Sequence, residues 1–316
     1  MSRMYQVEDF FNIEEQRELD RVLNMISGRQ VEVFRVSYVG QGQNYLIFCA
    51  EVDELTVCVR IGATGKDECI SELKKALSIC EKNNIITNKV LFSDFSCRKI
   101  RRPYMITTFI DGSTYDISEF READSCRFFS DFGDYLARLH NIRSPYFLKE
   151  LNTENRLDIR EYLSRRYLKL YEGLKQCENS QIDINSLDKI YQVFYNEIDF
   201  ESIVPRFVHR DISANNLIMN NGIFQCLIDF EHAVFFDCVW DFVKLELNIL
   251  SEINPMYREC FLKSYQSIIP LEQEKDSSLR FRLYYMLELM WAVVNDYNDS
   301  RKLYLDILKD FVEKER

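Results

Sequence analysis

The chain has 316 residues, of which 47% are hydrophobic and 29% are charged. That composition excludes a disordered chain, and the length is enough for one large domain or two lobes. The formal net charge of −11 argues against non-specific binding of nucleic acid, itself a polyanion, so we expect no nucleic-acid partner.

The cysteines also narrow the class of protein. Ten of them are scattered along the chain and none forms a C-x-x-C pair, so no zinc site is indicated. Most stand in apolar or mixed segments, which favours buried, reduced thiols in a cytoplasmic protein. The N-terminal segment lacks the apolar core of a signal peptide. No apolar run approaches the roughly 20 residues of a membrane-spanning helix, so we expect no membrane partner.

The N-terminal part of the chain is predicted to be a helix followed by strands. Residues 8–27 have the pattern of an amphipathic helix that ends before Gly28. Alternating apolar and polar residues then predict three strands, at residues 31–39, 44–52 and 55–61. A Gly40-Gln41-Gly42 turn separates the first two strands, and the third contains Arg60.

The same patterns predict the remaining elements. Residues 66–83 are expected to be a helix, with an apolar face that Leu73 and Leu77 share. Two further strands are expected at 89–93 and 104–110. The later helices are expected at residues 128–140, 157–176, 184–198, 240–250, 278–297 and 300–313.

One loop carries polar residues at spacings that a hydrophobic core does not require. Asp211 follows His209 by two residues, and Asn216 follows Asp211 by five. The two apolar runs that come next flank Asn220-Asn221-Gly222, whose residue types favour the left-handed turn of a tight hairpin. The hairpin would return Asp229 towards Asp211 and Asn216.

Three oxygen-bearing side chains in this order suit phosphoryl transfer. The protein must then hold Mg²⁺ against the phosphates of a nucleotide and orient an attacking hydroxyl group. Mg²⁺ prefers one or two carboxylates together with phosphate and water, and Asn216 and Asp229 can supply the protein oxygens. Asp211 can accept the proton of the hydroxyl group.

The motifs resemble those of a known family. The loop HRDISANN resembles the kinase catalytic loop H-R-D-x-x-x-x-N, and Ile228-Asp229-Phe230 stands where the D-F-G motif begins. The likeness is closer to the aminoglycoside phosphotransferase family, small-molecule kinases whose motifs read H-x-D-x-x-x-x-N, then I-D-[FW]-x-x-A, then a further Asp. Here IDFEHA matches the second motif, and Asp241 supplies the last residue.

The resemblance implies a protein-kinase-like, bilobal α+β fold. Residues 1–109 would form a small, β-rich nucleotide-binding lobe. Residues 110–316 would form a larger helical lobe for catalysis and acceptor binding. His209 and Asp241 would have structural roles in bracing the catalytic loop, and His140 is more readily read as structural than as catalytic.

The resemblance also implies how the nucleotide is held. Gly40 and Gly42 would cover the phosphates, although a G-x-G turn is also an ordinary glycine hairpin. Arg60 takes the place of the kinase lysine and would bind the phosphates as a bidentate fork; the alternative is an arginine facing solvent. Glu72 would orient Arg60, with Glu68 as its competitor. Backbone groups at Thr108, Phe109 and Ile110 would bind the base.

The acceptor is the least defined part of the site. Only eleven residues separate Asp229 from Asp241 and no A-P-E motif is present, so the chain lacks room for the activation loop of a regulated protein kinase. This favours a small, cationic, hydroxyl-bearing acceptor. The acidic residues that could face it are Glu231, Asp237, Glu246, Glu288 and Asp296, each of which could equally be a surface or capping residue.

The predicted function is therefore transfer of phosphate from ATP or GTP to a hydroxyl group of a small molecule, with Mg²⁺ as cofactor. An aminoglycoside or a related cationic antibiotic is the leading acceptor class, which would make the protein a resistance enzyme. A metabolite kinase of the choline, ethanolamine, homoserine or macrolide type is the first alternative. A nucleotide-binding pseudokinase that acts as a regulator is the second.

Overall fold

The computed structural model describes most of the chain in two compact units. The described residues are 10–28, 35–41, 45–52, 55–62, 67–116, 122–153, 155–177, 182–271, 275–295 and 300–315. The first unit comprises Met1–Phe128, Glu150–Asn152 and Ala214–Ala233, and the remainder of the chain forms the second. The hairpin that carries Asp229 therefore belongs to the same unit as the N-terminal strands. None of the described helices is both long and apolar enough to cross a membrane.

The first unit is built on a 5-stranded antiparallel sheet with the order β1-β2-β3-β5-β4. Strands β1, β2 and β3 pair in chain order through short connections, and β5 lies between β3 and β4. The strands are β1 (Arg35–Gln41), β2 (Tyr45–Val52), β3 (Leu55–Gly62), β4 (Val90–Asp94) and β5 (Tyr104–Thr108).

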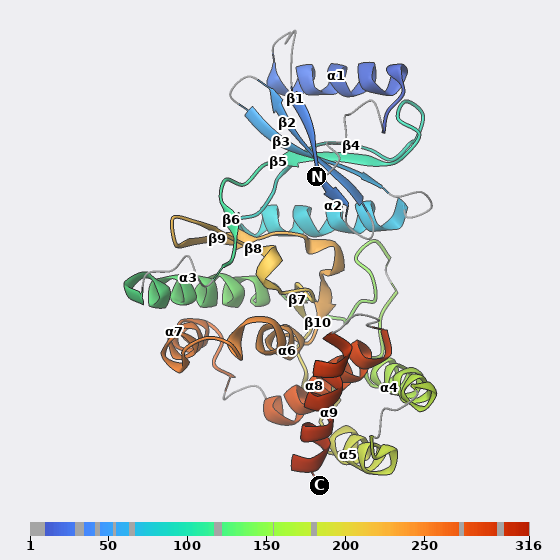
Figure 1. Ribbon diagram of the computed structural model, residues 1–316, viewed down its shortest axis with the longest axis vertical. Helices are drawn as coiled ribbons and strands as arrows, with labels where there is room; N and C mark the ends of the chain where they lie inside the picture. The colour runs from blue at the N-terminus through green and yellow to red at the C-terminus, as the bar shows by residue number, and fades with distance from the viewer. Residues whose placement is uncertain are drawn as a thin grey trace. The chain divides into compact units, whose positions relative to one another are not determined.

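Helix α1 (Ile13–Ser27) covers one face of this sheet. It begins at a capping box formed by Asn12 and Glu15, and it ends at Gly28, whose φ of 70° suits a glycine in the left-handed region. Leu19, Val22 and Leu23 pack with alternate residues of β2, β3 and β5 in one apolar cluster. Figure 1 shows the sheet between α1 and α2 (Asp67–Lys82).

The rest of the first unit is a smaller sheet of 3 strands in the order β6-β8-β9. Strand β6 (Ser113–Thr114) pairs with β8 (Leu217–Asn220), which turns back into β9 (Ile223–Leu227). The hydroxyl group of Thr87 donates a hydrogen bond of 2.8 Å to the carbonyl oxygen of Leu227. The hairpin is thereby fastened to the segment that follows α2.

The second unit is mainly helical (Figure 1). Aromatic side chains dominate its interior, as in the contact between Trp240 and Tyr284 with ring centroids 4.9 Å apart. Two short strands, β7 (Arg206–Val208) and β10 (Val234–Phe236), pair antiparallel beside the catalytic loop. The helices are α3 (Glu122–His140, in this unit from Phe129), α4 (Ile159–Gln176), α5 (Ile184–Glu197), α6 (Val239–Leu245), α7 (Pro255–Gln266), α8 (Ser277–Asn295) and α9 (Ser300–Lys314).

Three features differ from expectation. Helix α7 was not among the predicted helices. The helix predicted at 240–250 is α-helical only as far as Leu245 and continues as a π-helical turn, Glu246–Leu250, of the kind that often occurs at functional sites. Of the ten cysteines, Cys126 and Cys260 are disulfide-bonded rather than reduced, so the prediction of reduced thiols is wrong for these two. The other eight are free.

Candidate functional site

The β8–β9 hairpin brings Asn216 and Asp229 to one end of the same structure. Leu217 pairs with Leu227, and the N–H of Ile228 donates a hydrogen bond of 2.9 Å to the carbonyl oxygen of Asn216. The residues that flank the two strands therefore lie next to each other. Asp229 has a left-handed backbone, with φ of 66°, and directly precedes the 3-10 turn Phe230–His232. A non-glycine residue in this region is uncommon and often marks a functional site.

The turn of the hairpin has the predicted chemistry. Asn220 pairs with Ile223, so that only Asn221 and Gly222 form the loop. Both have positive φ, 52° and 74°, which is the signature of a type I′ turn. Its twist matches that of the strands, which is why a two-residue loop can return the chain in register.

A buried carboxylate holds the catalytic loop of the second unit. Asp241 accepts hydrogen bonds of 2.7 Å from the backbone N–H groups of His209 and Arg210. His140 Nε2 lies 3.0 Å from the same carboxylate, and its Nδ1 lies 2.8 Å from the hydroxyl group of Tyr265. Burial opposes ionisation of Asp241, but His140 and His209 outweigh it and hold its pKa below the ordinary value. Asp241 therefore braces the loop as a carboxylate.

The loop presents Asp211 next to this brace. The N–H of Asp211 donates to His209 Nδ1 at 3.3 Å, and the side chain of Asp211 is partly exposed. The preceding residue, Arg210, has φ of 66° and directs its guanidinium to the hydroxyl group of Tyr162 at 3.0 Å. It lies over the rings of Phe236 and Trp240, so that it anchors the loop in the aromatic interior. The sequence motif alone did not indicate these partners.

In the first unit, Arg60 lies on the sheet face away from α1. It is buried, and its guanidinium donates a hydrogen bond of 3.2 Å to the hydroxyl group of Thr107. Its Nε is buried and has no hydrogen-bond partner among the described residues. The alternative of an arginine facing solvent is therefore wrong.

Glu72 does not pair with Arg60, and this corrects the predicted role of Glu72. Its carboxylate instead accepts hydrogen bonds from the backbone N–H groups of Leu151 and Asn152, at 2.6 and 2.9 Å. Asn152 also binds the adjacent Ser71 through its side chain. The orientation of α2 turns this acid towards the segment Glu150–Asn152. The side chain of Glu68, the competing candidate, lies outside the described residues.

The predicted base-binding residues follow β5. The N–H of Thr108 donates to Lys89, its carbonyl oxygen accepts from Asn88, and the N–H of Phe109 donates to Thr56. Phe109 is exposed and Ile110 is half-buried. Gly40 lies in β1, opposite Ile47, whereas Gly42 lies outside the described residues. Their roles with a nucleotide stay predictions.

Two of the acidic residues expected to face the acceptor are enclosed by the second unit, so that expectation is wrong for them. Asp237 is fully buried and is bonded to Arg280 and to the hydroxyl group of Tyr284, both at 2.8 Å. Glu288 is 3% exposed and forms ion pairs with Arg166 and Lys244. Asp237 neutralises the buried Arg280, and Glu288 neutralises the half-buried Arg166 and Lys244. Sequence spacing could not show these pairings.

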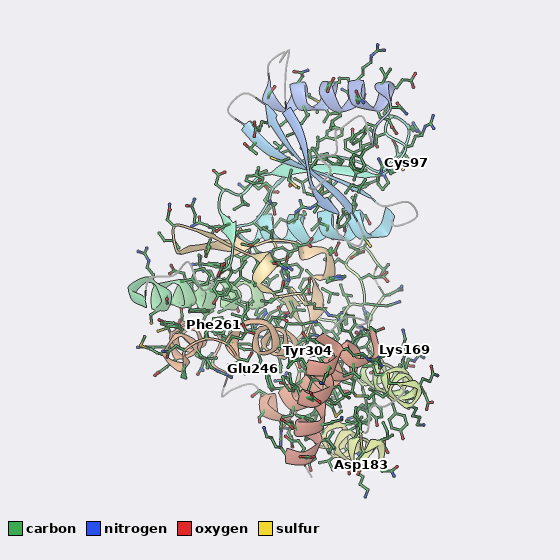
Figure 2. All side chains as sticks on the ribbon, viewed as in Figure 1. Cys97, Lys169, Asp183, Glu246, Phe261 and Tyr304 are labelled. Carbon is green, nitrogen blue, oxygen red and sulfur yellow. The ribbon has the colours of Figure 1, made fainter. Side chains whose placement is uncertain are left out.

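The other candidates are less enclosed. Glu246 pairs with Arg258 at 2.9 Å and borders a hollow of about 270 Å³ that is mainly apolar. Its place in the second unit is labelled in Figure 2. Glu231 belongs to the first unit and lies within the IDFEHA motif, two residues after Asp229. Asp296 lies outside the described residues.

The residues at the end of the hairpin fit Mg²⁺ better than a transition metal. No group of three or more His, Cys, Asp or Glu side chains among the described residues is arranged to hold a metal. Mg²⁺ needs fewer protein ligands, because one or two carboxylates and the phosphates of a substrate complete its shell. The Asp229 carboxylate and the Asn216 amide are donors of that kind.

Comparison with known proteins agrees with this geometry. Residues 50–275 match the phosphotransferase enzyme family, APH. No curated protein sequence is significantly similar to the chain. A solved structure called "Putative fructosamine-3-kinase", from Haemophilus somnus 129PT, has a TM-score of 0.67 at 15% identity and covers 96% of this chain and 99% of its own.

Aminoglycoside phosphotransferases have the same fold. The gentamicin complex of APH(2'')-IIa has a TM-score of 0.65 at 17% identity, covering 96% of both chains. Apo APH(4)-Ia, a thermostable mutant, has a TM-score of 0.62 at 14% identity, covering 93% of this chain and 98% of its own. The predicted protein-kinase-like α+β fold is thereby confirmed. Because the family match spans more than half of the chain, this protein belongs to the phosphotransferase enzyme family.

Proposed function

We propose that the protein transfers the terminal phosphoryl group of ATP or GTP to a hydroxyl group of a small molecule. The observation that carries this proposal is the β8–β9 hairpin, which brings Asn216 and Asp229 together at one end. Asp211 precedes Asn216 by five residues on a loop that Asp241 holds by its backbone. A chain that had lost this chemistry would have no need to keep all three residues in place, which argues against a pseudokinase.

Each residue has a distinct role in the proposed reaction. The side-chain amide oxygen of Asn216 and the Asp229 carboxylate would hold Mg²⁺, which would neutralise the charge of the nucleotide phosphates. Asp211 accepts a hydrogen bond from the acceptor hydroxyl group, aims its oxygen at the γ-phosphorus and takes its proton. Arg60, with its unpartnered Nε, binds the phosphates. Gly40 and Gly42 cover them, and backbone groups at Thr108–Ile110 bind the base.

An aminoglycoside is the first acceptor class to test. The structures similar in fold include complexes with gentamicin and streptomycin. The short span between Asp229 and Asp241 favours a small acceptor over a protein. Glu231 and Glu246 are the described acids that remain candidates for contact with its amino groups.

A less cationic amino sugar is the second candidate. One structure of similar fold carries the name of a fructosamine kinase. Asp237 and Glu288 are both neutralised by internal cations, so that two of the acids expected to bind a polycation are not available for it. An acceptor with a single amino group needs fewer free carboxylates.

A screen by thermal shift and phosphate transfer tests the proposed function. Aminoglycosides, a fructosamine, choline, ethanolamine and homoserine are added to the protein with Mg²⁺ and either ATP or GTP. A ligand that binds only the folded state raises the midpoint of unfolding. The proposal expects a stabilising acceptor that gains one phosphate by mass spectrometry. If no hydroxyl compound gains phosphate while the nucleotide is bound, a regulatory pseudokinase becomes the better account.

A further inference from the structure

Tyr45, the first residue of β2, carries a buried hydroxyl group that the fold itself does not use. The residue is 3% exposed, and its hydroxyl oxygen makes no hydrogen bond with any of the described residues. Buried polar groups in folded proteins nearly always have partners, so an exception requires an explanation such as a ligand.

The register of the sheet fixes the face on which Tyr45 lies. Directly opposed residues of an antiparallel pair share a face, and alternate residues along a strand do so too. Ile47 is opposite Arg60, so Tyr45 lies on the same face as Arg60. Leu46, Ile61 and Tyr104 lie on the other face, which packs against α1.

The surroundings of Tyr45 place its hydroxyl group near the hairpin end. Burial raises the pKa of Tyr45, and the nearby carboxylates of Glu231 and Asp229 raise it further. A tyrosine hydroxyl group is protonated at neutral pH, so it can donate a hydrogen bond. Glu231 lies within reach of this hydroxyl group as a hydrogen-bond acceptor, but the contact does not have the geometry of a completed hydrogen bond.

A second donor on the same face has no partner either. Arg60 Nε, on the strand next to Tyr45, is buried and has no hydrogen bond to the described part of the chain. Tyr45 and Arg60 are diagonal neighbours, and such pairs have Cα atoms roughly 7–8 Å apart. Two unpartnered donors at this spacing, one of them cationic, suit an anion with several oxygens.

We propose that the Tyr45 hydroxyl group donates a hydrogen bond to a phosphate oxygen of the bound nucleotide, beside Arg60. This rests on the proposed function, since a nucleoside triphosphate is the anion that phosphotransfer brings to this face. Tyr45 is then a nucleotide-binding residue that the glycine, lysine and D-F-G positions of the kinase motifs do not include. The rival account is a structural brace in which Tyr45 bonds to Glu231.

Tyr45→Phe removes the hydroxyl oxygen and keeps the ring. Tyr104→Phe is the matched control, because Tyr104 is a fully buried tyrosine of the same sheet whose hydroxyl group is also unpartnered but lies on the α1 face. Affinities for ATP, GTP and adenosine are measured by calorimetry with Mg²⁺ on the full chain. Adenosine carries the base and the ribose without phosphates.

The proposal expects Tyr45→Phe to weaken binding of the preferred triphosphate by about ten-fold, as for a lost hydrogen bond to a charged group. Adenosine affinity stays unchanged, as do all affinities of Tyr104→Phe. The unfolding midpoint without ligand is unchanged or higher in both variants, because each loses an unpartnered buried group.

Three results overturn the proposal. If Tyr45→Phe binds the triphosphate with wild-type affinity, the hydroxyl group does not contact the triphosphate. If the unfolding midpoint of that variant is also lower than that of the wild type, Tyr45 is a structural brace bonded to Glu231. An equal loss of adenosine and triphosphate binding shows an indirect effect. Absence of triphosphate binding by the wild type overturns both proposals. If the wild type binds triphosphate but phosphorylates no acceptor, only the proposed function fails, and the affinity ratio still decides the role of Tyr45.

Discussion

The Arg60 guanidinium is bonded to the hydroxyl group of Thr107, at 3.2 Å, and not to the carboxylate of Glu72. Arg60 thus lies buried on its sheet face with a positive charge that no described carboxylate neutralises through an ion pair. Such a charge is costly to bury unless an anion joins it. The geometry therefore separates the roles of Arg60 and Glu72, which kinase-like motifs would link.

Arg60→Gln should weaken nucleotide binding by about ten-fold or more, because the variant loses the charge that attracts the phosphates. Adenosine binding should not change. Arg98→Gln, at an exposed arginine of the same unit, is the control. Calorimetry with ATP and GTP makes the comparison, and equal affinities in the two variants would mean that Arg60 does not meet the phosphates.

Glu72→Ala should destabilise the segment Glu150–Asn152 and leave nucleotide affinity nearly unchanged. The substitution leaves the N–H groups of Leu151 and Asn152 without their acceptor, at an expected cost of about 1–3 kcal/mol. Hydrogen exchange at these two amides should accelerate. Glu81→Ala, at an exposed acid of the same helix, is the control and should change neither the exchange of these amides nor the nucleotide affinity. A large loss of nucleotide affinity in Glu72→Ala alone would restore the role that the motif implies.

Local turn chemistry could be predicted from the sequence, whereas the partners of buried charged side chains could not. The Asn220–Gly222 turn was predicted because its chemistry is local: two residues with positive φ need Asn and Gly. The partner of Glu72 depends on how α2 packs, and the segment it meets lies 79 residues further along the chain. Asp237 and Glu288 were read as possible acceptor contacts because their cations, Arg280 and Arg166, come from distant helices.

Gly112 marks a close approach that tolerates no side chain. Its φ is 143°, and a Cβ atom there would lie 2.3 Å from the carbonyl oxygen of Met219. Gly112→Ala should cost about 2–6 kcal/mol, adding backbone strain to overpacking. Gly28→Ala, where φ is also positive but nothing lies within 4 Å, should cost only about 1–2 kcal/mol. Denaturant unfolding of both variants measures the difference, and equal costs would show that β8 moves away freely.

The hydrogen bonds of Asp241 predict how the stability of the fold depends on pH. Because the folded-state pKa of Asp241 is below the unfolded value of about 3.8, its carboxylate stabilises the fold above that pH. The contribution is lost as the pH falls through the folded-state pKa. Asp241→Asn should cost about 3–5 kcal/mol at neutral pH and flatten the acid dependence of the unfolding midpoint below about pH 4.

Asp310→Asn, at an exposed acid of α9, is the control for that prediction and should leave the acid dependence as in the wild type. His140→Ala should resemble Asp241→Asn in part, since it removes one of the groups that hold the carboxylate. A wild-type acid profile in Asp241→Asn would contradict the proposed brace.

Phosphate transfer by Asp211→Asn tests the central claim most directly. The variant keeps the size of the side chain and removes the charge that takes the hydroxyl proton. Transfer from γ-labelled ATP or GTP to the acceptor found in the screen is measured in single turnovers, beside nucleotide affinity. We predict that transfer falls by about 10²–10⁴-fold while nucleotide affinity changes little. Transfer at nearly the wild-type rate would show that Asp211 is not the base and would contradict the proposed mechanism.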